Sequence, residues 1–419
     1  MSEAAAGQQA DVVVLGAGMV GVSAALSAWQ RGLSVIVVDR RPPGSETSYG
    51  NAGILSSGSI LPLNTPSLWK NLPKYLSNTH PALRWNIPWA VANAGWVIRF
   101  LASAAPSQTR PRATALHGLI GTSLQLHRDW IVKAGAAHRI RETGWLKAWR
   151  GDGLAAAKAE QAALAEFGIA SEVLDRQGIS ALEPNIIPAY SVGLLHTQTA
   201  SVDSPGAVVK AYAQMLADGG GIVRQSEIRR IEPQGEGWRA LLADGSIAAR
   251  HVVVALGPWS AELLQPLGYR VPLAFERGYH QHFVPNPVRK LLRPIHDSDG
   301  GFLMTPMEQG IRVTSGVELT ARDAPSNFAQ LEAVVPMARS VAEFGDAVGE
   351  RWRGARPTLP DSLPMIGAAP RHRGLWLAFG NQHIGFTTGP GTGAAIAAMI
   401  AGDAPPFDVS AFAPRRYIA

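Results

Sequence analysis

A glycine-rich turn between two short apolar runs lies near the start of the chain, and it limits the fold more than any other feature. The run DVVVL at 11–15 lacks polar alternation, which is typical of a strand buried on both faces. GAGMVG at 16–21 follows, then an Ala-rich helical segment to about residue 31 and the run SVIVV at 34–38. This order of strand, turn, helix and strand predicts a βαβ unit at the start of an α/β fold.

The glycine spacing and the acid that follows it predict a dinucleotide site. The first glycine permits a tight turn, the second lets a pyrophosphate approach the backbone, and the third lets helix and strand pack closely. The start of the helix offers unpaired amides to the phosphates. Asp39, 18 residues after Gly21, stands where a carboxylate binds ribose hydroxyls, which argues against NADP. The expected cofactor contacts of this unit are Gly16, Gly18, Met19, Val20, Gly21, Asp39 and Arg40.

Three later segments favour FAD over NAD. ETSYGNAG at 46–53 offers hydroxyls and small residues, VVVALGPW at 252–259 is a strand ending in small residues, and GNQHIGFTTGPG at 380–391 leads into a helix. The N-terminal dipole of that helix could face the flavin edge that becomes negative on reduction. An NAD-dependent dehydrogenase is the rival interpretation, and it leaves the first and third segments unexplained. The contacts expected here are Thr47, Ser48, Asn51, Ala52, Gly53, Ala255, Gly257, His383, Ile384, Gly385, Phe386 and Thr387.

Length and composition indicate a globular protein with two domains. At 419 residues the chain exceeds what one hydrophobic core supports. It has no cysteine, which excludes disulfides and thiolate metal sites, and no metal is expected. Its 38 Lys and Arg residues are scattered, which argues against nucleic-acid binding. Residues 1–10 do not resemble a signal peptide and no run of 18 apolar residues occurs, so we expect a cytoplasmic protein without a membrane span.

Strand and helix patterns like those of the first βαβ unit occur again later in the chain. Other segments separate them, which favours interleaved domains. Helices are expected near 154–167, 205–218, 327–345 and 390–401, and strands near 143–150, 221–224, 273–284, 301–317 and 375–379. A long functional loop is expected at 42–67 and a hairpin at 227–242. The FAD-binding domain is placed at 1–80, 196–265 and 350–419, and the substrate-binding domain at 81–195 and 266–349.

Several segments occur in the order found in a known flavoprotein family. They are ETSYGNAG at 46–53, RETGWL at 141–146, ERGYH at 276–280 and GARPTLPD at 354–361. From Asp11 to about Gly402 the chain resembles the D-amino acid oxidase superfamily, and within it the bacterial D-amino acid dehydrogenase group. The resemblance implies a Rossmann-like FAD-binding domain interleaved with a sheet-rich α+β substrate domain. It also implies electron transfer to a quinone or another carrier, or to oxygen.

The resemblance also implies a residue that binds the substrate. In that family the arginine of a G-x-R-P segment commonly holds the substrate carboxylate, and here Gly354 and Arg356 occupy this segment and are expected beside the cofactor. A planar guanidinium can bind both carboxylate oxygens and fix the α-carbon beside the flavin. The alternative is a structural ion pair between Arg356 and Asp361.

Three more side chains are candidates for the catalytic site. Tyr279 and His280 stand on a strand that should line the substrate cavity, where they could contact the carboxylate or amine. The alternative is an aromatic strand packed in the core. His383 lies in the loop before the last helix and could touch the flavin edge or the substrate, or serve only to hold its loop.

The predicted reaction is oxidative deamination of a D-amino acid to a 2-oxo acid, with hydride transfer from Cα to flavin N5. It requires positioning, exclusion of water and stabilisation of the reduced flavin rather than a base. The alternative substrates are secondary amines or cyclic imino acids, of the sarcosine, glycine, D-proline or hydroxy-D-proline type. Thr305–Glu308 lacks the basic residue that several amine oxidoreductases of the superfamily carry there, which leaves the substrate class open. A non-catalytic FAD-bearing electron carrier is a further hypothesis.

Tryptophan and basic residues gather between Pro66 and Ala102. The aromatic members are Trp69, Trp85, Trp89, Trp96 and Phe100, and the basic ones are Lys70, Lys74, Arg84 and Arg99. Such a mixture suits a peripheral contact with the inner membrane, where a quinone could accept electrons. The alternative is that these rings form the core of the substrate domain or the roof of its cavity.

Overall fold

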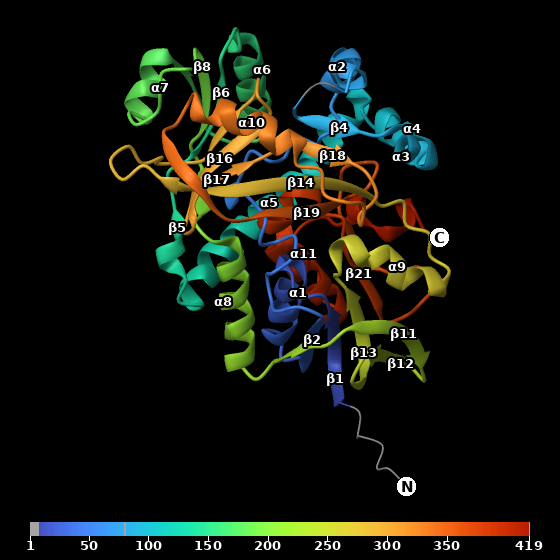
Figure 1. Ribbon diagram of the computed structural model, residues 1–419. Coiled ribbons are helices and arrows are strands. Elements are labelled where there is room, and N and C mark those ends of the chain that lie inside the picture. The colour runs from blue at the N-terminus through green and yellow to red at the C-terminus, as the bar shows by residue number, and fades with distance from the viewer. Residues whose placement is uncertain (1–7, 79–80, 419) are drawn as a thin grey trace.

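The computed structural model describes residues 8–78 and 81–418, so the prediction that no signal sequence is present falls largely outside the described residues. Within them, an eight-stranded sheet has the order β10-β2-β1-β13-β12-β11, with β21 beside β13 and β20 beside β21 (Figure 1). β10, β2, β1, β13 and β21 run parallel, so their carboxyl ends share one edge. The strands are β1 (Gln8–Leu15), β2 (Val35–Asp39), β10 (Ile222–Gln225), β11 (Ile228–Gln234), β12 (Gly237–Leu242), β13 (Gly245–Val254), β20 (Met365–Ala368) and β21 (Leu375–Phe379).

Both faces of this sheet are covered, because its central strands are apolar throughout. Val12 and Val14 of β1 face a cluster that holds four helices, whereas Val13 and Leu15 face the side on which β12 and α9 pack. α1 and α11 touch so closely that a Cβ on Gly393 would overlap the backbone of Ser23. The four helices are α1 (Met19–Trp29), α5 (Pro106–Lys133), α8 (Pro205–Asp218) and α11 (Gly385–Ala401), and α9 is Ser260–Leu264.

A ten-stranded sheet crosses the carboxyl ends of these strands (Figure 1). Its order is β4-β18-β14-β17-β16-β15-β6-β8-β7, with β19 beside β14. The strands are β4 (Leu83–Trp85), β6 (Trp145–Trp149), β7 (Ser171–Asp175), β8 (Val192–His196), β14 (Ala274–Pro285), β15 (Ile295–Asp297), β16 (Phe302–Met307), β17 (Gly310–Thr314), β18 (Val317–Leu319) and β19 (Phe344–Thr358). A small sheet of β3 (Ile54–Ser56), β9 (Thr199–Val202) and β5 (Ile140–Arg141) lies beside it.

The register of the large sheet sorts its side chains onto two faces. Trp352 pairs with His280, His280 with Thr314, and Thr314 with Leu303, so these four side chains share one face. Residues between them, such as Tyr279, face an apolar cluster that includes α10. The helices around this sheet are α10 (Ala329–Arg339), α6 (Leu154–Ala165), α7 (Arg176–Leu182), α2 (Ser67–Leu76), α3 (Ile87–Ala92) and α4 (Ala94–Ala102).

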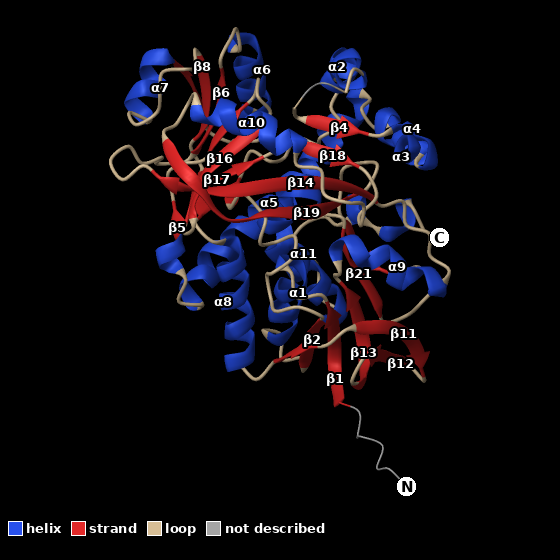
Figure 2. Ribbon diagram, viewed as in Figure 1, coloured by secondary structure: helices blue, strands red, loops and turns tan. Residues whose placement is uncertain are grey.

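The expected architecture is confirmed. An α/β part built on parallel strands meets a part dominated by strands, as Figure 2 shows. The helix expected at 205–218 and the strand expected at 375–379 have the expected bounds. The last helix begins earlier than expected, at Gly385. β19 was not expected, because residues 344–358 are rich in glycine and charge and show no apolar alternation.

Two segments of the chain pack in a different domain from the one expected for their residues. α5 falls within 81–195, yet it packs in the cluster of α1 and α11. β19 crosses residue 350, yet it pairs with β14 along most of its length and so belongs to the large sheet as far as Thr358. In both places tertiary contacts, which sequence patterns do not report, decide where the segment packs. Residues 1–7 and 79–80 of the expected FAD-binding domain lie outside the described residues.

One stretch among the described residues, Gln382–Ala401, is long and apolar enough to cross a membrane by composition. It contains α11, and 78% of its apolar window is buried inside the protein. Its apolar character is therefore explained by its place in the core between α1 and α5.

Candidate active site

A cavity of about 470 Å³ lies where the carboxyl ends of the parallel strands meet the large sheet, the edge at which α/β sheets bind ligands. One wall consists of the β1–α1 turn, the ends of β2, β13 and β21, and the start of α11. The other is the face of β14, β16, β17 and β19, with Trp145 of β6. The predicted cofactor contacts that line the cavity are Gly18, Met19, Val20, Asp39, Arg40, Thr47, Ser48, Asn51, Ala52, Ala255, Gly257, Gly354, Arg356, His383, Ile384, Gly385, Phe386 and Thr387.

Three predicted glycines are not among the lining residues but shape the turns behind it. Gly16 has a φ of +112°, and a Cβ there would overlap the carbonyl oxygen of Ala255. A Cβ on Gly21 would overlap the carbonyl oxygen of Gly16, and one on Gly53 would overlap that of Val202. These glycines therefore act through close backbone packing rather than through contact with a ligand.

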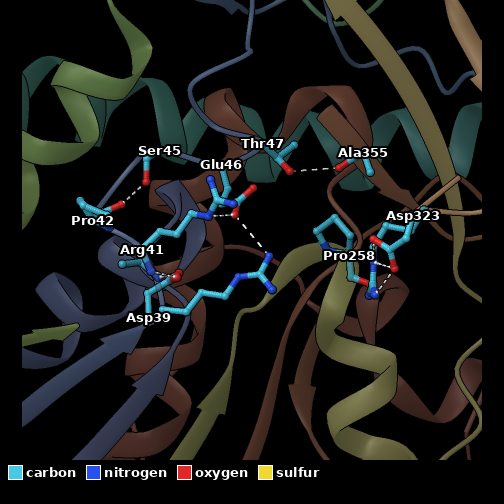
Figure 3. Close-up of polar contacts among 12 residues, drawn as sticks. Asp39, Arg41, Pro42, Ser45, Glu46, Thr47, Pro258, Asp323 and Ala355 are labelled. Atoms are coloured by element: carbon cyan, nitrogen blue, oxygen red, sulfur yellow. Dashed lines mark hydrogen bonds and ion pairs between the residues drawn. The ribbon is translucent and has the colours of Figure 1, made fainter. Parts of the chain in front are cut away.

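Asp39 and the loop after β2 form the polar side of this wall (Figure 3). The Asp39 carboxylate accepts the backbone N–H of Ala17 at 2.7 Å and that of Arg41 at 3.0 Å. The Thr47 hydroxyl donates to the carbonyl of Ala355 at 3.0 Å, which ties the loop to β19. The loop thus joins the two walls, and Asp39, which lines the cavity, is held in place by these backbone N–H groups.

The start of α11 presents polar groups that lack partners. Asn381 Oδ1 and Gln382 Nε2 are buried without a hydrogen bond, and both residues line the cavity. Gln382 has a φ of +51°, which is strained for a residue other than glycine. Buried polar groups are normally paired, so these atoms mark a place where a ligand would complete the hydrogen bonding.

Arg356 points into the cavity from β19 as an unpaired cation. Its guanidinium lies where a Cβ on Gly278 would be, and it makes no hydrogen bond or ion pair with any described residue. The alternative ion pair with Asp361 is wrong, because Asp361 pairs with Arg416 at 2.7 Å. Among the described residues Arg356 is the one Lys or Arg that reaches the cavity from the large sheet.

Comparisons with known proteins agree with this geometry. Residues 11–399 match the family described as FAD dependent oxidoreductase. The chain belongs to this family. It is 31% identical to a D-amino-acid oxidase of Bradyrhizobium diazoefficiens, over 97% of this chain and 99% of that protein. It is 29% identical to a D-amino acid dehydrogenase of Chromohalobacter salexigens, over 97% and 100%. The crystal structure of glycine oxidase from Geobacillus kaustophilus has the same fold, with a TM-score of 0.75 and 20% identity over 98% of this chain and 100% of that chain.

FAD is the cofactor of this family, and the residues present fit it. Two helix starts, at Met19 and Gly385, open into the same cavity and give it two positive dipole ends. The unpaired groups of Asn381 and Gln382 lie at the second start. Asp39 would hold the ribose, the first helix start the phosphates, and the second helix start the flavin.

His383 faces this cavity as a neutral ring. It is exposed, but to the cavity rather than to bulk water, and its position is consistent with the predicted contact to the flavin edge or the substrate. Burial by the surrounding protein, together with the charge of Arg356, lowers the pKa of His383 to about 4. His383 can therefore donate one hydrogen bond and accept another at neutral pH, but it adds no positive charge to the site.

Tyr279 and His280 are not among the residues that line the cavity. Strand alternation turns Tyr279 to the opposite face, where its hydroxyl meets Arg277, Glu318 and the N–H of Asn327. His280 is on the cavity face, but the indole of Trp352 stacks on it with ring centroids 4.8 Å apart. The prediction that both line the cavity is therefore wrong, because it took no account of strand phase or of Trp352.

A second cation on the cavity face does not enter the cavity. Arg312 of β17 has its Nε 3.0 Å from His282 Nε2 and donates to the carbonyls of Tyr49 and Asn51. Burial lowers the pKa of Arg312 to about 10. The second carboxylate clamp that is missing from 305–308 is thus not supplied by Arg312.

Four further side chains line the substrate side and were not predicted from the sequence: Trp145, Leu303, Thr314 and Trp352. Thr314 Oγ1 is buried without a hydrogen-bond partner. Trp352 lies so close over Gly50 and Gly354 that a Cβ at either glycine would overlap its ring. A strand prediction for 344–358 would have revealed Trp352, because it stands four residues before Arg356 on the same face.

Proposed function

We propose that the chain oxidises D-amino acids to 2-oxo acids with release of ammonia. The observation that carries this proposal is the unpaired guanidinium of Arg356. It reaches the cavity from the ten-stranded sheet, opposite the wall that would hold FAD. A lone cation of this kind suits a substrate with one carboxylate. The names of the two curated relatives support D-amino acids as the substrates.

When bound, FAD supplies the hydride acceptor, and the residues of the chain supply position and environment. Arg356 would hold the carboxylate by two hydrogen bonds and so fix the orientation of the Cα–H bond. Nearby Glu276 does not form an ion pair with Arg356, and its Oε1 accepts the Thr358 hydroxyl at 2.9 Å. Burial raises the pKa of Glu276, and the charge of Arg356 opposes the rise. With no hydrogen bond to Glu276, the guanidinium would keep its N–H donors for the substrate.

The substrate side of the cavity would accommodate a neutral side chain. Its walls are Trp145, Leu303 and Trp352, with the unpaired hydroxyl of Thr314 between them. No carboxylate from the large sheet lines the cavity among the described residues, and His383 is neutral. Water exclusion by these apolar walls would strengthen the interaction of Arg356 with a carboxylate.

The test is anaerobic mixing of the purified protein with an amine panel while flavin absorbance is recorded. The panel contains neutral and acidic D-amino acids, their L-enantiomers, glycine, sarcosine, D-proline and hydroxy-D-proline. Rapid bleaching by neutral D-amino acids supports the proposal, whereas bleaching by sarcosine or D-proline alone would replace it with the secondary-amine alternative. A protein that stays yellow with every amine would contradict the proposal and favour the hypothesis of a non-catalytic electron carrier.

Arg356→Leu, with Arg356→Lys as the matched control, tests the role of the guanidinium. Leu should raise KM by about a hundredfold or more, because a charge-assisted pair is lost, while FAD content stays at the wild-type level. Lys keeps the charge without the planar fork and should fall between the two. An unchanged KM for the best substrate in the Leu variant would remove Arg356 from the site.

We further propose that the α2–α4 group contacts an anionic lipid surface, on the cytoplasmic side of the inner membrane, with a quinone as electron acceptor. The sequence of this group, residues 67–102, has four Lys or Arg residues and no Asp or Glu. On α3 and α4, Ile87, Val91 and Ile98 are 69%, 72% and 66% exposed. Basic charge with exposed apolar side chains suits such a surface. Trp89 and Trp96 are instead buried, and the side chains of Lys70 and Lys74 lie outside those described.

Co-sedimentation with vesicles of phosphatidylglycerol and phosphatidylcholine at low salt tests this contact. Wild type should sediment with the mixed vesicles and not with phosphatidylcholine alone. Ile87→Ser with Val91→Ser should weaken binding, whereas Val288→Ser, at an 82% exposed position after β14, should not. A wild-type protein that stays in the supernatant with both vesicles would end this proposal.

A further inference from the structure

α11 contains a proline one turn after its start, and this leaves a backbone carbonyl without its helical partner. In an α-helix the carbonyl of residue 386 accepts the N–H of residue 390. Residue 390 is Pro390, which has no N–H and whose ring pushes against the carbonyl four residues earlier. Phe386 is buried and lines the cavity, so its carbonyl needs another donor inside the protein.

His127 of α5 supplies that donor. Its Nε2 lies 2.9 Å from the carbonyl oxygen of Phe386, and its Nδ1 lies 3.0 Å from the hydroxyl of Tyr212. A carbonyl can only accept, so Nε2 carries the hydrogen and Nδ1 accepts from Tyr212. Burial lowers the pKa of His127 to about 4, in keeping with a neutral ring. His127 is fully buried and stacks on the ring of Phe386, with centroids 5.5 Å apart.

A second contact from α5 holds the other side of the proline. Ser123, one turn before His127, accepts the N–H of Gly391 at 2.9 Å and donates to the carbonyl of Leu119 at 2.7 Å. A Cβ on Gly391 would overlap Ser123 Oγ, so the two helices are in close contact here. α5 therefore bonds to α11 both before and after Pro390.

The segment held in this way is the one that would hold the flavin. Gly385, Phe386 and Thr387 form the first turn of α11 and line the cavity. The Thr387 hydroxyl donates to the carbonyl of Ile54 at 3.0 Å, which joins this turn to the start of β3. A small displacement of the turn would move the positive end of α11 relative to the flavin edge that gains negative charge on reduction.

We propose that His127 is a positioning residue for FAD: its Nε2–H replaces the missing amide of Pro390 and fixes the first turn of α11 against the flavin. The residue makes no contact with the cavity among the described residues, so it acts through Phe386. This role does not depend on which amine is the substrate. Its failure would therefore leave the D-amino acid proposal standing, and the reverse also holds.

The test is a double-mutant cycle between His127→Phe and Pro390→Ala. Phe keeps a ring but removes the donor, whereas Ala at 390 returns an amide to the Phe386 carbonyl. His127→Phe should weaken FAD binding about tenfold, because a buried carbonyl is left unpaired. It should also make the midpoint potential of bound FAD more negative, because the helix dipole stabilises the reduced flavin less well. KM for the amine should stay within about twofold of wild type, since Arg356 is unaffected.

In the Pro390→Ala background the same His127→Phe change should cost about threefold or less in FAD affinity, and the potential should return toward the wild-type value. His127→Gln, which retains a side-chain N–H donor, should behave closer to wild type than Phe does. An equal loss in both backgrounds would mean that His127 acts by packing alone and would overturn the proposal. Wild-type FAD affinity and potential in His127→Phe would overturn it as well.

The proposal stays testable where His127→Phe does not fold. Recovery of soluble, yellow protein by adding Pro390→Ala would support it, because the only group returned is the amide that the Phe386 carbonyl lacks. Failure to fold in both backgrounds would count against it. Ser123→Ala is the matched control on α5: it removes the bond to Gly391, and adding Pro390→Ala should not repair its effect.

Discussion

The two walls of the cavity are built from different parts of the polypeptide. The FAD wall, which holds the β1–α1 turn and the start of α11, is made largely of turns and helix starts, where glycines and backbone amides would contact the cofactor. The substrate wall is a sheet face, where Arg356 and Trp352 of β19, Thr314 of β17 and Leu303 of β16 come from three different strands. The first wall therefore binds through the shape of its backbone, and the second through its side chains.

This difference predicts two classes of variant. A change that alters backbone shape in the first wall should lower FAD content, whereas a change of side chain in the second should alter the kinetics of the amine with FAD still bound. His127 is an instructive exception. It is a side chain, but it replaces a backbone amide, so changing it should lower FAD content.

The largest effect is expected from Gly16→Ala. Gly16 has a φ of +112°, and a Cβ would overlap the carbonyl oxygen of Ala255, so alanine can be accepted only if β1 and β13 shift. We expect FAD affinity to fall by about a hundredfold or more, with folding also weakened. FAD content of the purified protein and its fluorescence-monitored titration measure this effect.

Gly18→Ala is the matched control in the same turn. Gly18 has a φ of −75°, and its nearest contact for a Cβ is Ser48 Oγ at 3.4 Å, an ordinary separation. Its effect on folding should be small, and any loss of FAD would come from direct contact with the pyrophosphate. If Gly16→Ala bound FAD as well as Gly18→Ala, backbone packing would not be what specifies the first wall.

The same contrast explains how far the sequence predicts the site. Local patterns are sufficient for the first wall: the glycine spacing gives the turn, and Asp39 lies at the end of β2 as expected. The second wall depends on which strands are neighbours and on the phase of each strand. Tyr279 illustrates the problem, because a change of one position in strand phase separates a cavity residue from a core residue.

The sequence predicts Arg356 as a site residue because its family segment is distinctive. It does not predict Trp352. Trp352 stands four positions before Arg356 on β19, and alternation places both on the cavity face once the strand is known. No local signal marks residues 344–358 as a strand, since the burial of β19 changes from exposed to buried along its length. Pairing with β14 over a long register makes this segment a strand, and that pairing is a long-range property.

An intermediate effect is expected from Trp352→Leu. The indole fills the space over Gly50 and Gly354 and covers His280, so its loss would widen the substrate side and leave the FAD wall intact. We expect kcat/KM for small D-amino acids to fall about tenfold and bulkier ones to be accepted better, with FAD content unchanged. Steady-state kinetics over side chains of increasing size measure this.

Gly354→Ala provides an independent check on Trp352. A Cβ at 354 would overlap the indole, so this small addition should displace the ring and reproduce the substrate profile of Trp352→Leu. If the two variants differ in profile, or if both retain the wild-type profile, Trp352 does not limit the side chain of the substrate.

The smallest effect concerns the pH dependence of stability, to which buried histidines of the second wall contribute. His282 and His296 lie on the cavity side of the large sheet, and burial, aided by Arg312 and by Lys147 respectively, lowers their pKa values to about 4 and about 3. In the unfolded chain a histidine takes up a proton near pH 6.5. As the pH falls below that value the unfolded chain binds more protons, so the free energy of unfolding decreases until the folded-state pKa is reached.

Between pH 7.5 and pH 6.0 each such histidine should lower the free energy of unfolding by about 1 kcal/mol or less, and by more at lower pH. His296→Leu removes one of them, with Glu160, His196 and Lys147 as the titratable groups nearby. The variant should therefore lose less stability than wild type over this range, whatever its stability at pH 7.5. Thermal unfolding of the two proteins across the range measures the slope. Equal slopes would show that His296 is protonated in the folded protein or that the large sheet does not control acid unfolding.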